Sequence, residues 1–161
     1  MLMTLVSRPV LGGQCVCPSG FLSNAASHTG KTASSCSGLS PTAWASNTTW
    51  PTPYYATTKN GRNGYDATLY HCVVTGLNGY TFSGDTMLFV LQLSDDGGTR
   101  SLGRYIAAAL LNARKGLTPV LTETTVRQMW NDCISKGYYE PTAGAQWGAA
   151  QIITYIKSTL A

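Results

Sequence analysis

The residues of this chain whose chemistry is easiest to infer are its five cysteines: Cys15, Cys17, Cys36, Cys72 and Cys133. They form no CxxC motif, and a single residue separates Cys15 from Cys17, which is too close for ordinary zinc-ligand spacing. We therefore expect disulfides, with Cys36 paired to either Cys15 or Cys17, and Cys72 paired to Cys133. The odd number leaves one thiol unpaired or bonded to another chain.

The sequence gives little support to a catalytic site. Neither His28 nor His71 lies in a HExxH motif, and the GxSxG motif of hydrolases does not occur. Among the seven acidic residues, Asp132 and Glu140 are the pair with no evident structural role, and they would carry a hydrolase activity if there were one. We expect no enzyme, no cofactor and no metal.

A cluster of aromatic residues alternates with Pro, Thr and Asn in the first third of the chain. Its members Trp50, Tyr54 and Tyr55 would suit stacking on sugar rings or a protein interface, since Tyr and Trp are enriched at such surfaces. The alternative is that these rings cover the core where helices are lacking, and we favour this for Trp44 and Trp50.

The composition favours an extracellular protein. Only 11% of the 161 residues are charged, against about 25% in typical soluble domains. A neutral surface of this kind suits contact between copies, because little charge is desolvated when two such faces meet. The net charge is +4, but the basic residues are scattered and form no stripe, so we expect no nucleic-acid partner.

The first eleven residues are apolar and are followed by Gly12-Gly13. They are too few to span a bilayer, so we expect no membrane span. They resemble the tail of an export signal but lack its basic start. We expect residues 1–13 to form an extended arm that is buried either on its own domain or on a neighbouring copy. Its apolar contacts would come from Leu2, Leu5, Val6, Val10 and Leu11.

Residues 14–161 are expected to form a single globular domain in two parts. Residues 14–65 are rich in Gly, Ser, Thr, Asn and Pro and should be irregular and linked by disulfides. Residues 66–161 should be helical, because apolar residues recur at helical spacing between capping residues and glycines. The first predicted helix is capped by Asp66 and runs to about Thr75, with Leu69, Cys72 and Val73 on one face, and the second covers about 86–93, with Met87, Leu88 and Leu91 inward. A longer helix with one apolar stripe follows a cap at Thr99 or Ser101 and ends at Gly116, and two more helices cover about 123–136 and 145–159. The fold class is mainly α: a small helical bundle with an extended N-terminal arm and an irregular N-terminal third.

One group of motifs resembles a known family. Cys36-Ser-Gly-Leu-Ser-Pro-Thr-Ala-Trp44 is similar to the C-x-x-G-x-[ST]-P-x-x-W motif of poorly characterised exported bacterial proteins. A helix like Leu102–Ala113 and a second one beginning near Leu121-Thr122 follow in that family, so the resemblance covers about residues 36–160. Ala45-Ser46 stands where the family has a basic residue and its neighbour. The resemblance implies export and a helical C-terminal part, and no particular reaction.

Together these features predict a secreted structural subunit that self-assembles, with copies of itself as the partner and an extracellular filament as the possible product. The arm of one copy would add to the next, as in donor-strand assembly. The alternative is a secreted module that binds a glycan or a cell surface through Trp50, Tyr54 and Tyr55.

Overall fold

The computed structural model describes residues 14–21, 34–47, 49–58, 64, 66–74, 82 and 84–161. The predicted arm at residues 1–13 lies outside the described residues. The elements within these ranges are β1 (Gln14–Cys15), α1 (Pro18–Phe21), β2 (Ser34–Ser35), α2 (Pro41–Ser46), α3 (Tyr70–Val74), α4 (Met87–Leu91), α5 (Thr99–Lys115), α6 (Glu123–Lys136) and α7 (Ala149–Lys157). The mainly α fold class is confirmed.

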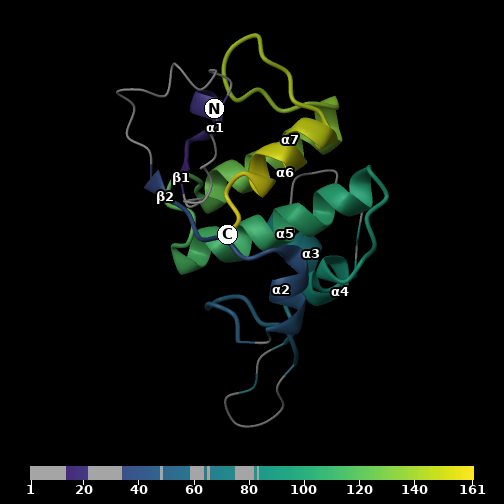
Figure 1. The fold of residues 1–161 in the computed structure, drawn as a ribbon. Coiled ribbons are helices and arrows are strands. Elements are labelled where there is room, and N and C mark those ends of the chain that lie inside the picture. Colours follow the sequence, from purple (N-terminus) through teal and green to yellow (C-terminus); the bar gives the residue numbers. More distant parts are fainter. Residues whose placement is uncertain are drawn as a thin grey trace, which may run out of the picture.

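Helix α5 is the centre of the molecule (Figure 1). It contacts α2, α4, α6 and α7, while α3 contacts α6. Every residue of α5 from Ser101 to Asn112 is buried except Tyr105, so this part of the helix is buried nearly all round. This differs from the single inward stripe that we predicted, because a helix surrounded by others has no face left for water.

The local signals predicted both ends of α6 and the C-terminal end of α5 well, whereas α5 begins after Gly98 and not after a Thr99 or Ser101 cap. The side chain of Thr122 accepts a hydrogen bond from the backbone N–H of Thr125 at 3.1 Å and so caps α6. Gly116 and Gly137 end α5 and α6 with φ of 81° and 91°, a left-handed conformation that costs glycine little. Helix α7 begins later than predicted, at Ala149.

The two short helices before α5 present different faces from those predicted. We expected Leu69, Cys72 and Val73 to face inward, but Tyr70 is the buried residue of α3 and Cys72 is exposed. In α4 the inward residues are Met87, Val90 and Leu91 rather than Met87, Leu88 and Leu91. Helices of five residues have too few turns for residue spacing to define one apolar face. The side chains packed around each helix therefore decide which of its residues are buried.

The described part of the N-terminal third is more regular than predicted. Strands β1 and β2 pair antiparallel, with Gln14 opposite Ser35. Helix α2 begins at Pro41, and the side chain of Ser40 accepts a hydrogen bond from Ala43 N at 3.1 Å. Serine followed by proline is a signal for the start of a helix, and the prediction that residues 14–65 are irregular did not take it into account.

A buried asparagine joins this third to α5. Asn112 Oδ1 accepts hydrogen bonds from Trp44 Nε1 and from Leu39 N, both at 2.8 Å, and Asn112 Nδ2 donates to Leu39 O at 3.0 Å. Asn112 is 0% exposed, so these bonds are its only compensation for leaving water. They hold α2 and the segment before it against the central helix.

Candidate functional site

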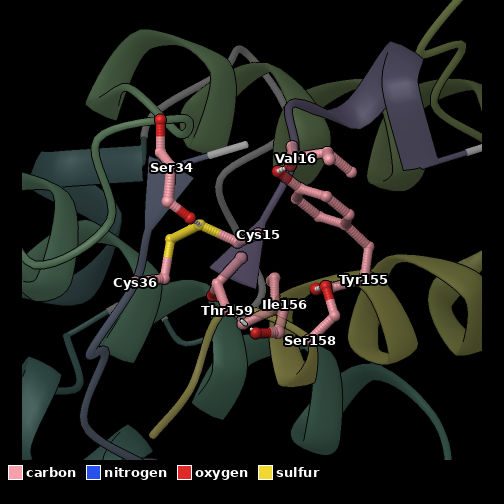
Figure 2. The surroundings of a disulfide bond; sticks show 8 residues. All are labelled: Cys15, Val16, Ser34, Cys36, Tyr155, Ile156, Ser158 and Thr159. Carbon is pink, nitrogen blue, oxygen red and sulfur yellow. Dashed lines mark hydrogen bonds between the residues drawn. A yellow bond between two sulfur atoms is a disulfide. The ribbon is translucent and has the colours of Figure 1, made fainter. Parts of the chain in front are cut away.

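The structure resolves the cysteine alternatives in favour of a Cys15–Cys36 disulfide, which closes a sequence separation of 21 residues. Both cysteines are buried. Figure 2 shows the disulfide beside the end of α7, near Ile156 and Thr159. Cys17 is exposed, and its Sγ lies 3.4 Å from Ser19 Oγ. The predicted disulfide in the N-terminal third is thus confirmed, with Cys15 as the partner.

The predicted Cys72–Cys133 disulfide is wrong, because both residues are free thiols. Cys72 is exposed on α3 and lies 3.5 Å from His71 Nε2, while Cys133 is half-buried on α6. Burial raises the pKa of Cys133, which keeps that thiol protonated and poorly nucleophilic.

The aromatic residues predicted to form a binding surface are mostly inside the protein. Trp50 is 8% exposed and Tyr54 is 2% exposed, while Tyr55 is half-buried. The prediction of a binding surface is wrong for Trp50 and Tyr54, since a buried ring cannot stack on a ligand. The alternative that Trp44 and Trp50 cover the core is correct, and Trp50 Nε1 donates to Trp44 O at 3.2 Å.

Tyr54 has a structural role instead. Its hydroxyl donates to Glu123 Oε1 and accepts from Arg127 at 2.9 Å. Burial, and then the hydrogen bond to Glu123, raise the pKa of Tyr54 to about 12, so the hydroxyl stays protonated at neutral pH. Arg114 contacts Glu123 at 3.5 Å and also donates to Thr52 O at 2.8 Å. These contacts fasten residues 52–54 to α5 and α6.

The two carboxylates considered for catalysis have separate local contacts. Asp132 lies 3.9 Å from Lys136, one turn along α6. Glu140 is exposed and accepts from Gly144 N at 3.3 Å. Neither carboxylate lines either of the two hollows described below. The carboxylate pair therefore gains no support as an active site.

A better candidate is an open groove over α7. Its first hollow has a volume of about 420 Å³ and is lined by Phe21, Trp147, Ala150, Gln151 and Thr154. None of these five side chains is charged. Phe21 comes from α1, and Trp147 precedes α7, so the hollow lies where the N-terminal third meets the last helix.

The rings at the first hollow form one packed cluster. Phe21 meets Trp147 edge to face at 5.9 Å and Tyr155 at 5.3 Å between ring centroids. Tyr155 donates its hydroxyl to Val16 O at 2.8 Å, which Figure 2 shows. Burial raises the pKa of Tyr155, so this donor is retained. Backbone hydrogen bonds of 2.8 Å in both directions between Tyr139 and Trp147 hold the tryptophan in place.

A second hollow of about 280 Å³ adjoins the first, because both are lined by Ala150 and Thr154. Its other lining residues are Asp95, Gly97, Ser101, Tyr105, Ile153 and Lys157. Ala150, Thr154 and Lys157 are exposed and follow one another at helical spacing, so they form an open stripe along α7. We call the two hollows together the α7 groove.

Sequence reasoning missed Phe21, Trp147 and Asn112 as important residues. Phe21 and Trp147 lie far apart in the chain and outside the predicted helical stripes, so no spacing links them. The signal for Asn112 was its place directly after the apolar run Ala107–Leu111, where a polar residue must find buried partners.

Two kinds of site are absent from the described residues. No three His, Cys, Asp or Glu residues among them could together hold a metal ion. No helix in these ranges is long and apolar enough to cross a bilayer.

Comparisons with protein-family models, with curated proteins and with solved structures give no match for this chain. The resemblance to exported bacterial proteins therefore stays a prediction.

Proposed function

We propose that this protein is a secreted structural subunit that self-assembles through its surface. The observation that carries the proposal is the first hollow of the α7 groove, an open and uncharged surface lined by the half-buried ring of Phe21 and by the exposed residues Ala150, Gln151 and Thr154 of α7. Trp147 also lines it but is 4% exposed, so its ring supports the hollow from inside the protein. Aromatic residues are enriched at contact surfaces between proteins, and charged residues are depleted at their centres. The low overall charge supports the same conclusion, because it lowers the cost of bringing two copies together.

Secretion is supported by the Cys15–Cys36 disulfide, since disulfides persist mainly in oxidising compartments. An extracellular subunit gains from such a bond, because it links Cys15 of β1 to Cys36, next to β2, by a covalent bond. Mass spectrometry of the protein isolated from its native host should find this pair oxidised.

Self-assembly is tested with the full chain by sedimentation velocity over a range of concentrations, together with negative-stain electron microscopy. We expect oligomers that grow with concentration, and extended polymers at high concentration. A chain that sediments as a monomer at every concentration would contradict the proposal.

A second candidate function is binding of a glycan in the same hollow. Gln151 and Thr154 line the same hollow as the Phe21 ring, and a ring together with an amide and a hydroxyl is a combination that suits a sugar. Binding on a glycan array that is lost in Gln151→Ala, with the oligomeric state unchanged, would favour this function over self-assembly.

A further inference from the structure

We propose that residues 1–11 of one copy bind in the α7 groove of a second copy, with leucine and valine side chains in the first hollow. This inference rests on the self-assembly proposed above and names the segment and the surface that meet. The product would be a head-to-tail polymer, since each chain carries one donor segment and one acceptor groove.

The chemistry of the first hollow fits an apolar segment. Its five lining residues carry no charge, and the Phe21 ring among them is only half-buried, whereas the Trp147 ring behind it is 4% exposed. A dry cavity of roughly 150 Å³ is enough to bind benzene. The volume of about 420 Å³ therefore has room for more than one aliphatic side chain. Residues 1–11 supply five such side chains in Leu2, Leu5, Val6, Val10 and Leu11, and only one charged side chain, Arg8.

The position at which residues 1–11 join the domain is also consistent with binding in the groove of a second copy. Gln14 and Cys15 are held in β1, and Val16 O is bonded to Tyr155 of α7 at 2.8 Å. The arm is therefore joined to the domain close to the groove. Eleven residues can reach at most about 36–40 Å, which is enough to cross to a neighbouring molecule.

A donor and an acceptor on different patches of one chain make a heterologous contact. Repeating such a contact generates an open polymer unless the rotation between copies closes a ring. The low overall charge of the chain also lowers the cost of any contacts that neighbouring copies make outside the groove. The geometry thus accounts for a filament with no further binding partner.

The test separates the donor from the acceptor with two full-length blocking variants, one full-length control variant and one deletion. Ala150→Phe places a benzyl group where the two hollows meet, and because Ala150 is exposed the fold should tolerate the change. Thr154→Tyr, also at an exposed position shared by both hollows, is a second blocking variant. The matched control is Gln128→Phe, which adds the same ring at an exposed position of α6 that lines neither hollow. Deletion of residues 1–11 removes the donor, and circular dichroism checks that each chain is folded.

Ala150→Phe and the deleted chain should each sediment as monomers, while Gln128→Phe should assemble like the unchanged protein. A mixture of Ala150→Phe and the deleted chain should form a 1:1 dimer that grows no further, because it contains one usable donor and one usable acceptor. The inference is overturned if both blocking variants assemble normally, or if the mixture stays monomeric as it would when each arm binds its own domain. If the unchanged protein is itself monomeric, the proposed function fails as well.

Discussion

Replacing Asn112 by alanine should destabilise the protein by about 3–5 kcal/mol, because each buried group left without a partner costs roughly 1–3 kcal/mol. The substitution removes three hydrogen bonds, two accepted by Oδ1 and one donated by Nδ2. Trp44 is 0% exposed, so its indole N–H would find no water in exchange. Leu39 is only half-buried, and its backbone groups can be partly rehydrated, which keeps the expected loss below the sum of three full penalties.

The assay is equilibrium unfolding in urea, followed by circular dichroism and by tryptophan fluorescence. The two signals should shift together if α2 and α5 unfold as one unit. Gln128→Ala, an exposed substitution on α6, serves as the control and should change stability by less than about 0.5 kcal/mol.

A double-mutant cycle with Trp44→Phe tests the reasoning more directly. Phenylalanine removes the indole donor, so the two changes together should cost less than the sum of the single changes, by about 1–2 kcal/mol. A loss of under 1 kcal/mol for Asn112→Ala, or strict additivity with Trp44→Phe, would refute the role assigned to this asparagine.

Three further outcomes are expected. Replacing both Cys15 and Cys36 by serine should cost about 3 kcal/mol, because the disulfide closes a separation of 21 residues; an unchanged urea midpoint would contradict this. Gly38→Ala should cost about 1–3 kcal/mol, because its Cβ would lie 2.8 Å from Thr159 O and 2.9 Å from Asn112 Nδ2. Gly20→Ala, whose Cβ would meet only ordinary contacts, is its control in the same unfolding experiment. Hydrogen bonds from the backbone N–H groups of Gly98 and Ser101 lower the pKa of Asp96 below 3.8, so its stabilising effect is present above that pH and is lost as the pH falls through the folded-state pKa. Asp96→Asn should therefore flatten the loss of stability that occurs as the pH falls below the ordinary pKa of an aspartate, measured by urea unfolding, and an unaltered pH profile would count against the role of these hydrogen bonds.

The long helices could be predicted because their limits depend on nearby residues. Thr122 and Gly137 mark the ends of α6, and Gly116 ends α5, through hydrogen bonds and dihedral preferences that act within one turn. The Cys15–Cys36 disulfide was one of two pairings left open, and spacing alone could not choose between Cys15 and Cys17. The choice depends on β1 pairing with β2, which places Cys15 opposite Ser34 and close to Cys36.

The groove and the buried partners could not be predicted, because they join residues that are far apart in the chain. Phe21 meets Trp147 only after α1 has been placed on α7. Tyr54 was a candidate surface aromatic, but like Trp50 it packs in the core, because the described part of the N-terminal third has few elements of its own to fill it.

The amino-acid sequence alone determined the helical class, the ends of the long helices and the expectation of a disulfide, since composition, periodicity and capping act locally. Only the tertiary structure decided which aromatic rings are buried, which cysteines are bonded and where an open groove remains. These depend on packing between distant segments, where the shape and burial of each side chain are set by neighbours that no sequence spacing identifies.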